Sequence, residues 1–121
     1  MAVIRYLVDD VDAALAFYTE QLGFEVEQRM GPAFAMVSRG DLTLWLAGPL
    51  SSAARPMPDG RRPEPGGWNR FVVEVDDLDG KVEELKRAGL AFRNEIVTGP
   101  GGKQILLEDP AGNVVELFEP S

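Results

Sequence analysis

The chain lacks the two side-chain types that most often carry out metal-binding and nucleophilic chemistry in proteins. It has no histidine and no cysteine among its 121 residues. The commonest metal ligand and general base is therefore missing, and disulfides, thiolate metal sites and cysteine nucleophiles are excluded. The groups that remain for such chemistry are mainly the 20 carboxylates.

The charge balance restricts the classes of partner. A net charge of −8 argues against nucleic acids and anionic membranes, which both require clustered lysine and arginine. The apolar run at residues 2–8 is interrupted by Arg5, is too short to span a bilayer, and lacks the layout of a signal peptide. We therefore expect a cytoplasmic protein, and the 45% apolar content predicts a single domain, 1–121, with a buried core.

An internal repeat organises the chain. Asp9-Asp10-Val11-Asp12 and Asp76-Asp77-Leu78-Asp79 each follow a short apolar run and precede a helical pattern. The aspartates are suited to cap a helix start, and Gly23 and Gly89 are suited to end each helix in a left-handed conformation. A duplicated unit of this size determines the fold.

Each copy has the pattern of a β-α-β-β-β unit. Short β-branched and aromatic runs predict the strands, and apolar residues at helical spacing predict the helices. The predicted strands are 3–8, 24–30, 33–38 and 42–47 in the first copy, and 70–75, 91–98, 103–108 and 114–118 in the second.

The segment that joins the copies has a different composition. Residues 48–67 contain five prolines and several glycines and arginines, and no apolar period continues through them. This composition is typical of a loop or linker. We expect modules at 1–47 and 68–121, with a linker at 48–67 that is either a lid or a passive connector.

These features resemble the vicinal oxygen chelate superfamily, which includes glyoxalase I, extradiol dioxygenases, and fosfomycin- and bleomycin-resistance proteins. The resemblance rests on three stretches: Asp10 through Phe17-Tyr18 to Leu22-Gly23-Phe24, Val73 to Leu78, and Asp109-Pro110-Ala111-Gly112-Asn113 to Leu117. It implies an α+β fold of two tandem βαβββ modules, whose curved mixed sheet forms a cleft with the helices outside.

The resemblance also identifies the positions at which metal-dependent members hold their ligands. They correspond to Arg70 and Glu116 in the second copy. The aspartates Asp10 and Asp77 are 67 residues apart, and this offset maps Arg70 onto Val3 in the first copy. Aligning Gly40 with Gly112 maps Glu116 onto Leu44. Two apolar residues, one permanent cation and one carboxylate do not suit a divalent metal. We therefore expect no metal and no cofactor.

The remaining cleft residues predict a ligand groove. Strand alternation starting from these positions places Leu42, Leu44 and Leu46 on the cleft face and Trp45 on the helix side. Arg70 and Glu116 either contact a ligand or form a purely structural ion pair. The expected ligand-contacting residues are Arg5, Phe34, Met36, Leu44, Trp68, Arg70 and Phe118.

The predicted function follows the metal-independent members of the family. We expect a protein that sequesters a small, partly aromatic molecule in the manner of bleomycin-resistance proteins, as in antibiotic resistance, and the resemblance implies a homodimer. One alternative is a glyoxalase-like lyase, isomerase or epimerase with Glu116 as the catalytic general base. Another is a divergent, dioxygenase-like metalloenzyme that uses Glu116 with Glu74, Gln104 or Glu108. Whether the protein is an enzyme stays open at this point.

Overall fold

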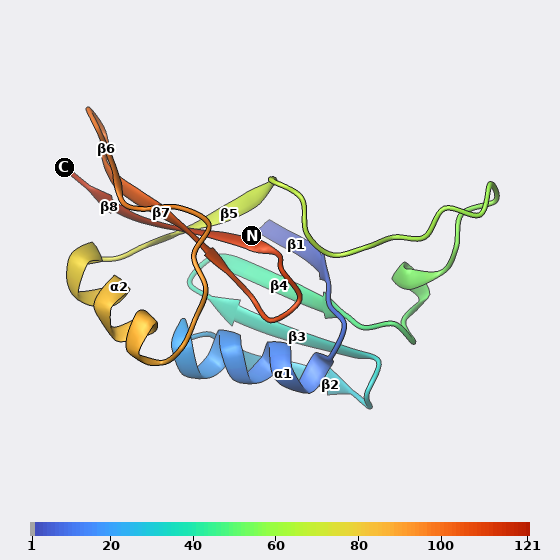
Figure 1. Ribbon diagram of the computed structural model, residues 1–121. Helices are drawn as coiled ribbons and strands as arrows, with labels where there is room; N and C mark the ends of the chain where they lie inside the picture. The colour runs from blue at the N-terminus through green and yellow to red at the C-terminus, as the bar shows by residue number, and fades with distance from the viewer. Residues whose placement is uncertain (1) are drawn as a thin grey trace. The chain divides into compact units, whose positions relative to one another are not determined.

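The computed structural model describes residues 2–121 and divides between Gly66 and Gly67 into two compact units (Figure 1). The first contains β1 (Ala2–Leu7), α1 (Val11–Ala16), the π-helical segment η1 (Phe17–Gln21), β2 (Glu25–Met30), β3 (Phe34–Arg39), β4 (Leu42–Ala47) and the 3-10 helix η2 (Ser52–Ala54). The second contains β5 (Arg70–Glu74), α2 (Leu78–Arg87), β6 (Val97–Gly99), β7 (Gly102–Glu108) and β8 (Val114–Pro120). The predicted β-α-β-β-β order is confirmed in both units.

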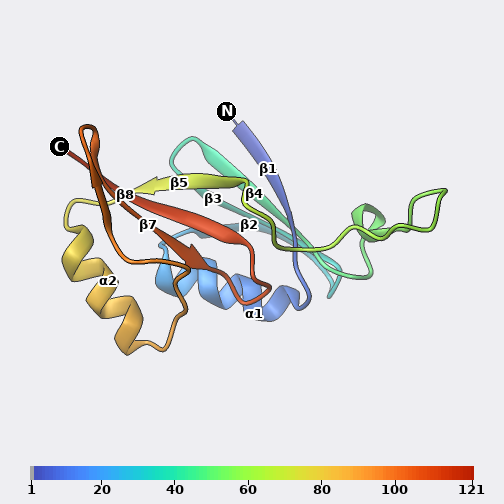
Figure 2. The ribbon, with the colours of Figure 1, turned by 45° about the horizontal axis from the view of Figure 1, so that its top comes forward.

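Each unit forms a four-stranded mixed sheet within residues 2–121. The strand orders are β1-β4-β3-β2 and β5-β8-β7-β6. The first and last strands of each unit pair in parallel, because the helix returns the chain to the same end of the sheet, and the other neighbours are antiparallel. Figure 2 shows the strands of each unit in a second view.

The helices begin and end where the sequence predicts. The carboxylate of Asp10 accepts a hydrogen bond from the Ala13 N–H at 3.2 Å, and that of Asp77 accepts one from the Gly80 N–H at 3.1 Å. Gly23 and Gly89 follow the helices with φ of 73° and 84°, a conformation that favours glycine. No helix within the described residues is long and apolar enough to cross a membrane.

One face of each sheet forms the core with the helix of its own unit. In the first unit α1 packs on β3 and β4, and in the second α2 packs on β8. The strand residues that point to this side are almost fully buried: Ala35, Val37, Leu44 and Leu46 in the first unit, and Phe71, Val73, Ile105, Leu107, Val115 and Leu117 in the second. We call the opposite side of each sheet its open face, since no helix of the same unit covers it.

The predicted facing of β4 is wrong. Leu44 has no exposed surface and belongs to the core, whereas Trp45 lies on the open face. Strand pairing shows the cause: Val3 pairs with Thr43, whereas the equivalent Arg70 pairs with Val114. The counterpart of Glu116 is therefore Trp45. The turn between β3 and β4 is shorter than the turn between β7 and β8. Aligning Gly40 with Gly112 therefore placed β4 one residue out of register with β8. A shift of one residue moves every side chain of a strand to the opposite face of the sheet.

The predicted strand at 91–98 is also mostly wrong, because only Val97–Gly99 forms β6. The backbone before it leaves the ladder at Asn94, whose side-chain Oδ1 accepts the Leu106 N–H at 2.9 Å. A side-chain acceptor thus replaces a backbone acceptor, and the regular pairing with β7 is reduced to a single bridge between Phe92 and Leu107.

Candidate functional site

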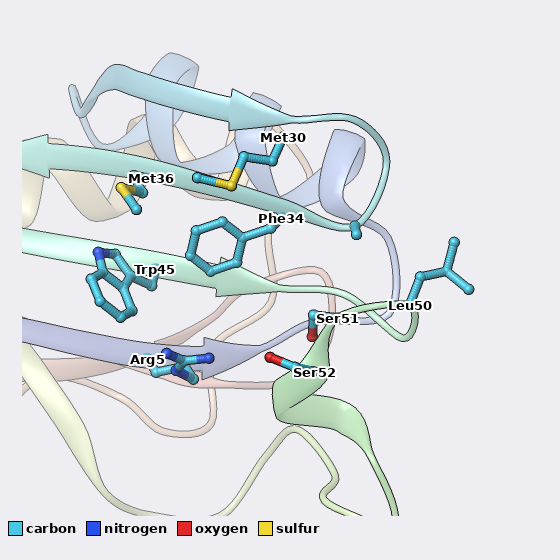
Figure 3. Close-up of a pocket in the computed structure, with 9 residues that line it drawn as sticks. Arg5, Met30, Phe34, Met36, Trp45, Leu50, Ser51 and Ser52 are labelled. Atoms are coloured by element: carbon cyan, nitrogen blue, oxygen red, sulfur yellow. The ribbon is translucent and has the colours of Figure 1, made fainter.

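A pocket lies on the open face of the first unit (Figure 3). Its volume is about 460 Å³, within the range of small-molecule binding sites. The residues that line it are Arg5, Met30, Ala33, Phe34, Met36, Trp45, Leu50, Ser51 and Ser52. Apart from one arginine and two serines, this lining is apolar.

Strand pairing brings the central residues of the pocket together. Arg5 on β1 pairs with Trp45 on β4, and Trp45 pairs with Met36 on β3. Phe34 lies two residues before Met36 on the same strand and therefore points to the same side. Three of the predicted ligand-contacting residues, Arg5, Phe34 and Met36, thus lie in one pocket.

Two aromatic rings and one cation form the floor of the pocket. The rings of Phe34 and Trp45 meet edge to face, with centroids 5.9 Å apart and an interplanar angle of 73°. The guanidinium carbon of Arg5 lies 4.9 Å from the Trp45 ring centroid. This cation–π contact positions the positive charge beside the apolar surface.

The beginning of the Pro/Gly-rich segment forms one wall. The Gly48 N–H donates to the Ala33 carbonyl at 2.9 Å, and the Ser51 hydroxyl donates to the Gly48 carbonyl at 2.7 Å. A Cβ on Gly48 would lie 2.8 Å from Cγ2 of Val11, so only glycine fits this close approach. These bonds fix the chain beside the pocket, and Figure 3 shows Ser52 on the side of Arg5.

The open face of the second unit contains an ion pair. Arg70 Nε donates to Glu116 Oε1 at 3.0 Å, and Arg70 Nη1 donates to the Trp68 carbonyl at 3.4 Å. Glu116 is only 8% exposed, and Val72 and Leu106 are its partners on the neighbouring strands. The pairing removes much of the cost of burying this carboxylate. A ligand contact or a catalytic role for Arg70 or Glu116 stays a prediction.

The other predicted residues of the second unit have different surroundings. Trp68 is 67% exposed, and its ring stacks on the Arg93 guanidinium at 4.5 Å. Arg93 also donates to Glu108 at 2.7 Å and to the carbonyls of Gly67 and Gly112 at 2.6 and 2.9 Å. Phe118 lies half-buried on β8. Trp68 and Phe118 are not among the residues that line the pocket of the first unit.

The sequence interpretation missed several pocket residues, above all Trp45. The signal was present in β4, where Leu42, Leu44 and Leu46 alternate with Thr43 and Trp45. In a strand with one buried face, the uniform leucines mark the core side. Met30 and the wall formed by Leu50, Ser51 and Ser52 had no comparable signal.

The side chains at the positions implied for a metal do not fit one. With the register corrected they are Val3, Trp45, Arg70 and Glu116, and the only carboxylate is paired with a guanidinium. Within residues 2–121, no three or more acidic, histidine or cysteine side chains are grouped so that they could hold a metal ion. Glu108, one of the alternative metal ligands predicted from the sequence, forms an ion pair with Arg93.

Comparison with known proteins gives the family. The human mitochondrial methylmalonyl-CoA epimerase is 27% identical over 94% of this chain and 70% of its own length. The crystal structure of lactoylglutathione lyase from Agrobacterium tumefaciens has a TM-score of 0.77 and 25% identity, covering 98% of this chain and 92% of that one. The bleomycin-binding protein of Streptomyces verticillus, solved with copper(II)-bleomycin, has a TM-score of 0.64 and 27% identity, covering 99% and 95%. The model of the glyoxalase/bleomycin resistance protein/dioxygenase superfamily matches residues 1–117, and the chain belongs to this superfamily.

Proposed function

We propose that this protein binds a small, partly aromatic molecule in the pocket of the first unit and sequesters it without a metal. The observation that carries the proposal is the arrangement of Arg5, Trp45 and Phe34 on the open face. An apolar pocket with a few fixed polar groups is the usual form of a small-molecule site. The bleomycin complex of a relative supports a binding role.

The lining favours binding over chemistry. Trp45 and Phe34 offer aromatic surfaces, and the adaptable thioethers of Met30 and Met36 complete the apolar wall. Arg5 offers a positive charge for an anionic or electron-rich group. None of the residues that line the pocket is a carboxylate, histidine or cysteine, so the pocket has no general base that could activate the hydroxyls of Ser51 and Ser52 as nucleophiles.

A second candidate function is proton transfer at Glu116, as in an epimerase or isomerase. Two observations favour it: the similarity to methylmalonyl-CoA epimerase, and the nearly complete burial of this carboxylate. Methylmalonyl-CoA incubated in D₂O would then exchange its α-proton in the presence of the protein. Exchange that disappears in Glu116→Gln would establish this function, and no exchange above the buffer rate would eliminate it.

Fluorescence provides a direct test of binding. The chain has two tryptophans, so Trp68→Phe leaves Trp45 as the only indole reporter. We expect metal-free bleomycin or naphthalene-2-carboxylate to change the Trp45 emission in a saturable way. Phe34→Ala should weaken this binding about tenfold, as truncation of a central aromatic contact does. Phe118→Ala, on the open face of the second unit, is the matched control and should leave the affinity unchanged. Unchanged Trp45 emission at high concentrations of both probes would contradict the proposal.

A further inference from the structure

A second hollow adjoins the pocket on the same open face. It has a volume of about 450 Å³ and is lined by Val3, Glu27, Met36, Ser38, Gly40, Thr43 and Trp45. Met36 and Trp45 line both hollows. These two side chains therefore form a shared apolar surface between the hollows, and one ligand can lie across it.

The two hollows contain opposite charges. Arg5 is the one charged residue that lines the first, and Glu27 is the one charged residue that lines the second. None of the ion pairs found within residues 2–121 involves either of them. Each charge is therefore available to a ligand without first breaking an ion pair.

An irregularity of β2 places Glu27 in the second hollow. The pairing of β2 with β3 shifts between Val26 and Gln28, so Glu27 is the extra residue of a β-bulge. A bulge changes the direction of its side chain. The Ser38 hydroxyl donates a hydrogen bond to Glu27 Oε1 and holds the carboxylate over β3.

Strand pairing sets the distance between the charges. Arg5, Trp45, Met36 and Gln28 are successive partners across the four strands β1, β4, β3 and β2. Neighbouring strands are about 4.8 Å apart, so about 14 Å separates the backbone at Arg5 from that of β2 beside Glu27. The net charge of −8 disfavours anions over the surface as a whole, and Arg5 offsets this repulsion at one end of the groove.

We propose that the ligand of this groove is an elongated aromatic zwitterion. Its anionic group contacts Arg5, its aromatic body lies over Trp45 and Met36, and its cationic group contacts Glu27. The inference rests on the proposed function and specifies the class of molecule bound. Arg5 and Glu27 then determine specificity, each for one end of the ligand.

A matched set of probes tests the inference. The zwitterion is 4′-(aminomethyl)biphenyl-4-carboxylate, and analogues in which a methyl group replaces one or both charged groups give an anion, a cation and a neutral molecule. Affinities are measured by isothermal titration calorimetry on the full chain and on Arg5→Gln and Glu27→Gln. Arg39→Gln on β3 and Glu25→Gln on β2 each remove one charge from the same sheet at a residue that lines neither hollow, and they serve as controls.

We expect the zwitterion to bind about two- to fivefold more tightly than either singly charged analogue, as one additional solvent-accessible ion pair allows. Arg5→Gln should weaken the anion and the zwitterion but not the cation, and Glu27→Gln should weaken the cation and the zwitterion but not the anion. Equal affinities of the zwitterion and the neutral analogue would overturn the inference and leave the proposed function standing. Failure of all four probes to bind would also overturn the inference, and the proposed function would be overturned with it only if metal-free bleomycin and naphthalene-2-carboxylate also left the Trp45 emission of the Trp68→Phe protein unchanged.

Discussion

The open faces of the two units have the same strand pairing and opposite chemistry. Arg5 and Trp45 in the first unit occupy the places of Val72 and Glu116 in the second. The first face presents aromatic rings and a guanidinium that stacks on one of them. On the second face, the guanidinium of Arg70 is bonded to a carboxylate of its own unit.

This difference shows how the two copies of a duplicated unit can keep one fold and present different chemistry on their open faces. On the first face, charge and apolar surface remain available to a ligand. On the second face, four charged groups are paired with one another, in the Arg70–Glu116 and Arg93–Glu108 ion pairs. The exchange of single residues at equivalent strand positions is enough to produce both results, because the backbone register is kept.

The largest expected effect separates two neighbouring residues of β4. Leu44→Ala should lower the free energy of unfolding by about 2–5 kcal/mol, because it removes a fully buried side chain from the core. Trp45→Ala should cost less than about 2 kcal/mol and abolish measurable binding of metal-free bleomycin. Urea denaturation and calorimetry measure the two quantities. If Leu44→Ala lost affinity while Trp45→Ala kept it, the assigned facing of β4 would be wrong.

An intermediate effect concerns the ion pair of the second face. Arg70→Ala should lower the free energy of unfolding by about 1–3 kcal/mol, because it leaves the carboxylate of Glu116 buried without its cation. Arg70→Leu combined with Glu116→Leu should recover most of this loss. Both proteins should bind naphthalene-2-carboxylate like the unaltered chain. A loss of affinity without a loss of stability would instead assign Arg70 to a ligand contact.

The smallest expected effect is a difference in pH dependence between the units. A hydrogen bond to Asp79 raises the pKa of Lys103 above its ordinary value of 10.5, with further contributions from the charges of Asp79, Glu119 and Asp77, while partial desolvation lowers it. The stabilisation that charged Lys103 gives the folded protein is therefore fully present below pH 10.5. It is lost as the pH rises through the higher pKa that Lys103 has in the folded state. Denaturation midpoints between pH 9 and about 11.5 should show this loss.

The first unit provides the comparison for this titration. In the first unit, Asp12 is the equivalent of Asp79, and it forms an ion pair with Arg29. The guanidinium of Arg29 stays charged throughout this pH range. Lys103→Arg should therefore remove the alkaline loss attributed to the second unit. A midpoint that falls equally in Lys103→Arg and in the unaltered chain would show that other groups cause the pH dependence.

The sequence was sufficient to predict the fold, because the repeat, the aspartate caps and the terminating glycines act locally. Asp10, Asp77, Gly23 and Gly89 have their predicted places in the structure. The strand at 91–98 was overpredicted because the acceptor role of the Asn94 side chain depends on its tertiary partner, Leu106. Such side-chain substitutions in a ladder leave no periodic pattern in the sequence.

The site was only partly predictable, and register explains most of the difference. Arg5 was found because alternation along β1 is local. Phe34 and Met36 were chosen because their strand was expected to line the cleft, and only the structure shows which way they face. Leu44 was chosen in place of Trp45 because the turn lengths of the two units differ, and a single-residue shift exchanges the two faces. The wall at Leu50 to Ser52 depends on how the chain turns back after β4, which composition alone does not specify.

The methionine methyl groups give the most direct test of the central claim, that the open face of the first unit is the binding site. Met30 and Met36 line the pocket, whereas Met57 lies in the linker segment outside it. In protein labelled with 13C-methyl methionine, titration with metal-free bleomycin or naphthalene-2-carboxylate should shift the Met30 and Met36 signals and leave Met57 unchanged. Saturable binding that leaves both Met30 and Met36 unmoved would contradict the account.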